Sequence, residues 1–173
     1  MISRRDFLKA ITAGIAIYPY RNVIASEKKE RILNLYNIHT EESLNIQYYY
    51  LGRYDINALA EINHFLRCHY TNEVMTMDVE LIDLLCDIKD KIGFNREVVI
   101  ISGYRSRLYN EYLRSIGRKV GVRSLHLIGC AIDFTIPGMS TKEIASIAKS
   151  FGKGGVGVYT DFVHIDTGRI RYW

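Results

Sequence analysis

The stretch SLHLIGCAIDFTI, residues 124–136, joins a predicted strand to polar side chains suited to a functional site. Residues 130–136 alternate with a period of two, which predicts a strand. One face of this strand carries Ile132, Phe134 and Ile136. Asp133 then lies on the opposite face, and His126 precedes the strand at a loop-to-strand transition.

A second predicted strand, over residues 162–167, has the sequence FVHIDT. Because alternate side chains of a strand share a face, His164 and Asp166 project together. If the two strands are neighbours, His164 comes to lie opposite Asp133 and His126. Two imidazoles and one carboxylate leave a fourth tetrahedral position for water, which distinguishes catalytic zinc sites from closed structural ones. From spacing alone, a structural His–Asp ion pair is the alternative.

The remaining patterns predict an α+β domain. Strands are expected over 31–40, 43–54 and 97–102, and helices after Asp55, after Asp78, over 109–116 and after the capping box Ser140–Glu143. A basic loop is expected over 117–124, and the glycine-rich residues 154–157 predict a turn that leads into the last strand. These elements predict a small antiparallel sheet with helices packed on one side.

The first 25 residues are typical of an export signal. Residues 3–9, SRRDFLK, form a twin-arginine pattern, and a short apolar run follows over 10–18. Residues 23–25 offer a cleavage point before Ser26, so the mature domain is expected to span 26–173. The apolar run is too short to span a bilayer, which needs about 20 residues. A basic amphipathic helix is the alternative interpretation.

The net charge of +4 is concentrated in this leader. Residues 1–25 hold four of the 23 basic and one of the 19 acidic residues, so 19 basic and 18 acidic residues remain. A nearly neutral domain has little electrostatic attraction for nucleic acid, and we expect no nucleic-acid partner. We also expect no membrane span after removal of the signal.

Three cysteines, Cys68, Cys86 and Cys130, form an odd set without a CxxC pair. Such a set does not predict a disulfide framework, although a Cys68–Cys86 bridge stays open as an alternative. Cys130 is next to the candidate site, but packing is the expected role of a cysteine beside a strand.

Several motifs resemble those of a known family. Ser124-Leu-His126-Leu-Ile-Gly129-Cys-Ala131-Ile-Asp133 resembles the S-x-H-x-x-G-x-A-x-D signature of the M15 family of zinc D-alanyl-D-alanine metallopeptidases. The SGYRS segment at 102–106 is also similar to that family. The GGVG segment at 154–157 and the FVHIDTG segment at 162–168, closing on Trp173, resemble the murein endopeptidase K branch. The resemblance covers roughly residues 30–173.

This resemblance implies an M15-type fold with one zinc ion on the sheet. His126, Asp133 and His164 would be the zinc ligands. Arg105 would lie near the substrate and pair with a peptide carboxylate, since a guanidinium fork matches that group. A structural salt bridge is the alternative for Arg105. Ser124 is expected beside the substrate in a supporting or loop-capping role, because no free histidine–carboxylate pair remains to activate it as a nucleophile.

The general base is implied less directly. Many M15 enzymes have a Glu-x-x-His motif, with the glutamate as base, and Asp161 occupies the matching position here. Asp166 is the rival, either as the base or as a partner that orients an imidazole. We favour Asp161 as the base.

The resulting expectation is a periplasmic, zinc-dependent peptidoglycan endopeptidase that hydrolyses peptide cross-links with metal-activated water. Two alternatives stay open: a zinc D,D-carboxypeptidase or dipeptidase that acts on stem peptides, and a non-catalytic wall-binding protein of the same fold. The sequence does not distinguish a D,D from an L,D cross-link, and it does not indicate the oligomeric state.

Overall fold

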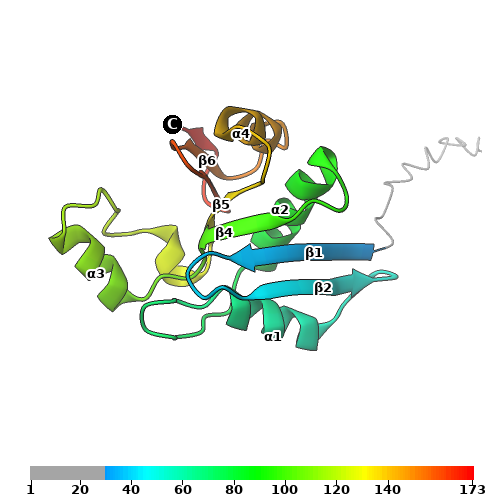
Figure 1. Cartoon of the computed structure of the whole chain (residues 1–173), viewed down its shortest axis with the longest axis horizontal. Helices are drawn as coiled ribbons and strands as arrows, with labels where there is room; N and C mark the ends of the chain where they lie inside the picture. Colours follow the sequence, from blue (N-terminus) through cyan, green and yellow to red (C-terminus); the bar gives the residue numbers. More distant parts are fainter. Residues whose placement is uncertain (1–29) are drawn as a thin grey trace, which may run out of the picture.

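The computed structural model describes residues 30–173, in which an eight-stranded sheet has the order β3-β2-β1-β4-β5-β7-β6-β8 (Figure 1). The strands are β1 (Glu30–Asn37), β2 (Ser43–Tyr50), β3 (Arg53–Tyr54), β4 (Val98–Ser102), β5 (Ala131–Thr135), β6 (Gly155–Val158), β7 (Val163–Asp166) and β8 (Arg171–Tyr172). The helices are α1 (Ile56–Phe65), α2 (Val79–Ile92), α3 (Arg107–Ser115) and α4 (Thr141–Lys149), and a 3-10 helix, η1, spans Leu125–Ile128. The predicted signal peptide, residues 1–25, lies outside the described residues.

The α+β class is confirmed, but the prediction of a small antiparallel sheet is wrong. The sheet has eight strands, and the β1–β4 and β6–β8 pairings are parallel. A parallel partner needs a long crossover, and the chain between β1 and β4 supplies one through a hairpin and two helices. At the other edge, β8 returns alongside β6 and not beside β7, which makes the final pairing parallel.

Two local predictions also differ from the structure. The residues 43–54 form two strands because Leu51 and Gly52 both have positive φ, 47° and 83°, and turn the chain into the β2–β3 hairpin. Of the residues 154–157 predicted as a turn, 155–157 lie in strand β6 (Gly155–Val158). Glycine suits this strand because its neighbours approach the backbone closely: a Cβ at Gly155 would lie 2.5 Å from Asp166 Oδ2.

The helix starts predicted from the caps Asp55, Asp78 and Ser140 are confirmed, whereas the helix predicted over 109–116 begins earlier, at Arg107. The Asp55 side chain accepts hydrogen bonds from the N–H groups of Asn57 and Ala58, and the Asp78 side chain accepts one from Glu80. Ser140 and Glu143 form the complete capping box of α4. These caps satisfy backbone donors that a helix leaves without partners at its first turn.

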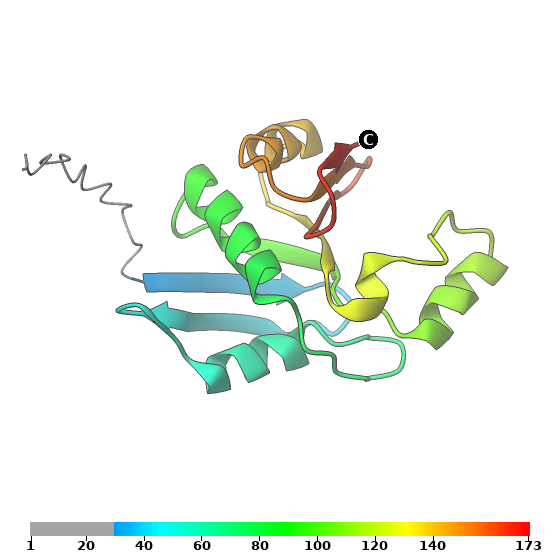
Figure 2. The same ribbon diagram turned by 180° about the vertical axis from the view of Figure 1, so that it is seen from behind.

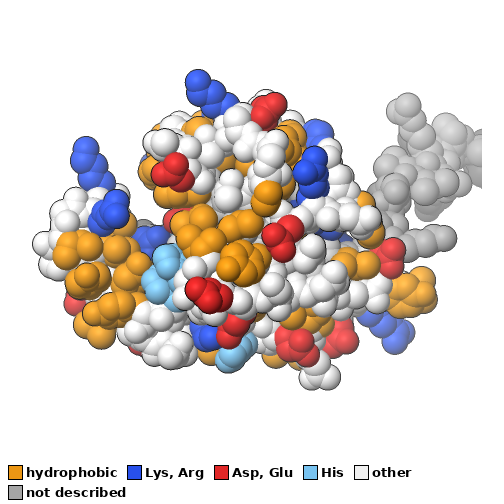
Figure 3. All heavy atoms as spheres, viewed as in Figure 1, with side chains coloured by type: hydrophobic (Ala, Val, Ile, Leu, Met, Phe, Trp, Pro, Cys, Tyr) orange, Lys and Arg blue, Asp and Glu red, His pale blue; other side chains and the backbone are white. Residues whose placement is uncertain are grey.

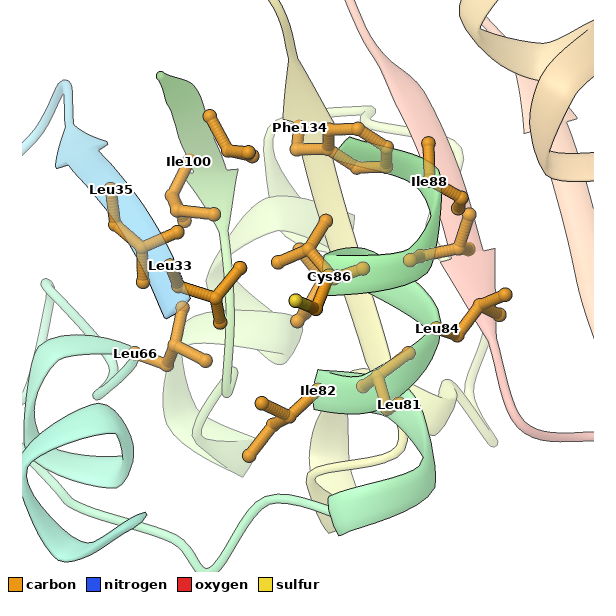
Figure 4. Packing of buried hydrophobic residues seen from close by; sticks show 14 of the residues in the cluster. Leu33, Leu35, Leu66, Leu81, Ile82, Leu84, Cys86, Ile88, Ile100 and Phe134 are labelled. Atoms are coloured by element: carbon orange, nitrogen blue, oxygen red, sulfur yellow. The ribbon is translucent and has the colours of Figure 1, made fainter. Parts of the chain in front are cut away.

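Helices α1, α2 and α4 contribute to one apolar core on one face of the sheet, as predicted (Figure 2). Figure 4 shows side chains of α2 packed against those of β1, β4 and β5. The residues labelled there are all nearly inaccessible to solvent: Leu33, Leu35, Leu66, Leu81, Ile82, Leu84, Cys86, Ile88, Ile100 and Phe134. Burial of each large side chain contributes roughly 1.5–3 kcal/mol, so this layer holds β5 firmly from behind.

Helix α3 departs from this arrangement. It projects from one end of the molecule (Figure 1), and of its nine residues Asn110 is buried.

None of the helices in residues 30–173 has the length and apolarity needed to cross a bilayer. Cys68 is a buried free thiol whose Sγ donates to Ser106 Oγ at 3.4 Å, so the Cys68–Cys86 bridge does not form.

Candidate metal centre

Strands β5 and β7 are antiparallel neighbours, and Asp133 and His164 are direct partners in their register. The helix η1, which precedes β5, places His126 beside them. His164 Nδ1 lies 2.7 Å from Asp133 Oδ1, and His126 Nε2 lies 3.2 Å from the same oxygen. One ligand atom from each of the three residues lies within 4.8 Å of the others, so the three predicted ligands converge on one point.

Gly129 allows His126 and Asp133 to approach each other across the loop. It ends η1 with φ of 72°, and a Cβ here would lie 2.5 Å from the Thr76 carbonyl oxygen. Its own carbonyl accepts a hydrogen bond from the Asp78 N–H at the start of α2. The glycine in the motif therefore serves a tight turn under close backbone packing.

The hydrogen bonds of His126 select its tautomer. Its Nδ1 lies 2.8 Å from the Gly103 carbonyl oxygen, which can only accept, so Nδ1 carries the proton. Nε2 then faces Asp133 and His164, and this nitrogen would offer its lone pair to a bound metal. With 2% of its surface exposed, the imidazole is held in the orientation that a metal ligand requires.

His164 is oriented by Asp166. The His164 Nε2 donates to Asp166 Oδ2 at 3.0 Å, which leaves Nδ1 facing Asp133 and His126. Asp166 has no exposed surface and also accepts hydrogen bonds from the N–H groups of Gly155 and Gly168 and from both terminal nitrogens of Arg171. Its oxygens are therefore fully used in holding β6, β7, β8 and the imidazole together.

The site groups shift one another's protonation. Burial favours neutral Asp133, but the charges and hydrogen bonds of His126 and His164 hold its pKa well below the usual range. Burial opposes protonation of His164, but its hydrogen bonds to Asp133 and Asp166 raise its pKa. Burial likewise acts against the Asp166 charge, and the hydrogen bonds from His164, Gly168 and Arg171 lower its pKa to about 2. An imidazolium between two carboxylates is a site where a metal cation can replace the shared proton.

Comparison with known proteins identifies the family. The family model described as peptidoglycan L,D-endopeptidase MepK matches residues 25–173. The peptidoglycan L,D-endopeptidase MepK of Escherichia coli strain K12 is 38% identical over 169 residues, covering 96% of this chain and 93% of that protein. The chain belongs to the MepK family of M15 peptidases. The probable peptidoglycan L,D-endopeptidase MepK of Haemophilus influenzae is 37% identical over 171 residues, covering 96% and 91%. No solved structure matches the chain.

In this MepK-family chain the other predicted site residues separate into two groups. Arg105 lies at the site, where its Nη2 donates to Asp133 Oδ2 and to Ser102 Oγ, both at 3.3 Å. Ser124 lines the same pocket and occupies the N-cap position of η1, but its side chain makes no capping hydrogen bond. Asp161 is exposed in the turn between β6 and β7 and is not among the residues lining the pocket.

The pocket in front of the triad has a volume of about 500 Å³. Beside the triad, Arg105 and Ser124, its lining comprises Arg118, Lys119, Val120, Gly121, Arg123, Leu125, Tyr159, Phe162, Arg171 and Trp173. The Tyr159 and Phe162 rings stack with centroids 4.5 Å apart, and Trp173 Nε1 donates to the Tyr159 hydroxyl at 3.1 Å. The site therefore has an aromatic side, built from the C-terminal strands and their turns, and a basic side.

Sequence reasoning did not assign a site role to this aromatic side or to Arg171. The available signal was Gly157, which lies between two valines of β6. A Cβ there would lie 2.6 Å from the Trp173 indole, so the glycine makes room for that ring. The pattern GGVG indicated that space was needed, but not which side chain filled it.

Proposed function

We propose that this protein is a zinc-dependent peptidoglycan endopeptidase that hydrolyses L,D cross-links between stem peptides. The observation that carries the proposal is the convergence of His126, Asp133 and His164 at the base of an open pocket. The relatives are peptidoglycan L,D-endopeptidases by name, and this supports the substrate and the bond, which spacing in the sequence left undecided.

The donor set suits one zinc ion. Two imidazole nitrogens and a carboxylate oxygen are ligands typical of catalytic zinc sites, and zinc there lowers the pKa of bound water to about 7 and polarises a carbonyl. The surrounding residues fix the donors: the Gly103 carbonyl holds His126, Asp166 holds His164, and Arg105 holds the second oxygen of Asp133. Binding would release the proton of His164 Nδ1, so zinc affinity should rise with pH.

We propose that Asp166 orients His164 and that Asp161 is the general base. The Asp166 carboxylate is buried and saturated with donors, which leaves it no acceptor for a proton from water. Asp161 is solvated and lies three residues before His164. Asp161→Asn should therefore lower kcat by about 100-fold or more while zinc affinity stays unchanged. An unchanged kcat would remove Asp161 from the mechanism.

We further propose that Arg105 and Ser124 contact the substrate. Both line the pocket, and the Arg105 guanidinium has donors beyond the Nη2 group that contacts Asp133. Residues 1–25 are proposed to direct the chain to the periplasm by the twin-arginine route, which agrees with a peptidoglycan substrate.

Digestion of purified peptidoglycan tests the proposal. The protein with zinc, with chelator, and as His164→Ala should be compared, with His64→Ala as a control because His64 is exposed and outside the pocket. Loss of L,D cross-linked muropeptides that needs both zinc and His164 is the expected result. Release of terminal D-alanine alone would indicate a carboxypeptidase, and zinc binding without any product would indicate a wall-binding protein.

A further inference from the structure

The loop that follows α3 places three cations on one side of the pocket. Arg118, Lys119 and Arg123 line it together with the triad, and all three are exposed to solvent. Figure 3 shows basic side chains projecting from the end of the molecule formed by α3 and this loop. These side chains belong to no part of the proposed zinc site.

The three loop cations differ from the other two arginines of the pocket. Arg105 is paired with Asp133, and Arg171 is paired with Asp166. Within residues 30–173, no carboxylate forms a salt bridge with any of the three loop cations. The pocket lining thus holds five cationic side chains and one carboxylate, Asp133.

This excess of positive charge is confined to the pocket. After residue 25 the chain has 19 basic and 18 acidic residues, so its charge is nearly balanced. A cleft lined by one sign of charge raises the local concentration of an oppositely charged substrate. The distribution therefore indicates an anionic group in whatever occupies the pocket.

The loop is anchored at both ends and in the middle. The Arg118 N–H donates to the Leu113 carbonyl at 2.9 Å, and the Ser124 carbonyl accepts from Leu127 N–H at 3.1 Å. Between them, the buried Asn110 of α3 donates through Nδ2 to the Gly121 carbonyl at 3.1 Å. Because the backbone is held, the cations reach the pocket without the full cost of ordering a loop on binding.

We propose that Arg118, Lys119 and Arg123 form a subsite for a peptide carboxylate near the scissile bond. The inference rests on the proposed endopeptidase function and specifies its substrate: cross-linked peptides that bear free carboxylates, in preference to the same peptides with those carboxylates amidated. Guanidinium and ammonium groups donate charge-assisted hydrogen bonds to a carboxylate, and an amide forfeits the charge. This subsite sets specificity and takes no part in bond breaking.

The test compares purified cross-linked muropeptides with their carboxylates free and after chemical amidation. With zinc, the wild-type protein should cleave the free form with kcat/KM about tenfold or more above that of the amidated form. The variant R118Q/K119Q/R123Q should lose most of this preference through a higher KM, with kcat within about twofold, because the cations bind the ground and transition states equally. A control, R53Q/K142Q/K153Q, neutralises three exposed cations outside the pocket and should keep the preference.

The outcomes separate the inference from the function beneath it. Equal cleavage of both substrates by the wild type, or an undiminished preference in the triple variant, would overturn the carboxylate subsite and leave the endopeptidase intact. Failure of the wild type to cleave either substrate with zinc bound would overturn the proposed function. If the triple variant does not fold, as judged by circular dichroism and zinc binding, Lys119→Gln and Arg123→Gln provide the same comparison singly.

Discussion

Asp166 is enclosed by donors from three strands and the turns beside them. Five hydrogen bonds reach its two oxygens, from the His164 imidazole, two backbone N–H groups and the Arg171 guanidinium. A buried carboxylate is stable only with such compensation. The same compensation fixes which nitrogen of His164 faces Asp133, so one side chain joins the sheet edge to the candidate metal site.

Asp166→Asn should weaken zinc binding by about 10–100-fold, because an amide cannot hold the His164 Nε2–H as a carboxylate does. Loss of the Asp166 carboxylate charge also removes the ion-pair partner of Arg171. Competition with a fluorescent chelator measures the affinity. Asp161→Asn is the matched control, since Asp161 is exposed and should leave the affinity unchanged. Wild-type affinity in Asp166→Asn would contradict the orienting role.

His69 provides a prediction about pH that is independent of the metal. Its ring stacks on His39 with centroids 3.9 Å apart and meets the Tyr109 ring edge-on. Burial, followed by the charges of His39 and Arg105, lowers its pKa to about 4 from an ordinary 6.5. The folded state therefore disfavours protonation of His69. The neutral His69 ring contributes fully to stability above pH 6.5, and this contribution is lost as the pH falls toward 4.

Denaturant unfolding at pH 7.5 and pH 4.5 tests this for the wild type and His69→Gln. Between pH 7.5 and pH 4.5 the free energy of unfolding of the wild type should fall by on the order of 1 kcal/mol more than that of the variant. Partial solvent exposure of the ring keeps this difference small. Parallel loss of stability in both proteins would show that His69 does not contribute to the pH dependence.

At the scale of elements, strand β6 positions the C-terminus against the site. Val158 N–H donates to the Trp173 carbonyl at 2.9 Å, and Trp173 N–H donates to the Val156 carbonyl at 3.2 Å. These bonds bring the indole against the bare backbone of Gly157 and to a ring-centroid distance of 5.3 Å from His164. The edge pairing of the sheet thereby builds one side of the pocket.

Gly157→Ala should displace the indole, because the added methyl would lie 2.6 Å from its ring atoms. Trp173 is the single tryptophan of the chain, so its fluorescence emission should shift to longer wavelength as the ring becomes more hydrated. Gly93→Ala, at the end of α2, is the control, since its nearest neighbour is the flexible Arg96 side chain. Identical spectra for Gly157→Ala and wild type would mean that the strand accommodates the methyl without moving Trp173.

At the scale of the whole molecule, zinc binding should increase the stability of the folded state. The proposed ligands come from η1, β5 and β7, which lie on different parts of the chain and converge only when the sheet is formed. Free zinc at about 100 times its dissociation constant should stabilise the fold by about 2.7 kcal/mol. Thermal unfolding with zinc and with chelator should show this difference in the wild type and in His64→Ala, but not in His164→Ala. A zinc-independent Tm in the wild type would contradict a folded-state metal site.

The local patterns of the chain predicted much of this architecture. Alternation over 130–136 indicated β5 and its two faces, and the caps Asp55, Asp78 and Ser140 marked three helix starts, because these signals depend on neighbouring residues. The resemblance to M15 peptidases named the three residues that now lie together.

Those local patterns did not predict the features that depend on long-range pairing of strands. The parallel β1–β4 and β6–β8 pairings follow from crossovers whose direction no short segment specifies. The saturation of Asp166 requires β6, β7 and β8 in register, and the pocket joins the basic loop after α3 to Trp173 at the far end of the chain. Side-chain chemistry and local spacing are written along the sequence, whereas the contacts that assign each group its role form only when the sheet brings distant segments together.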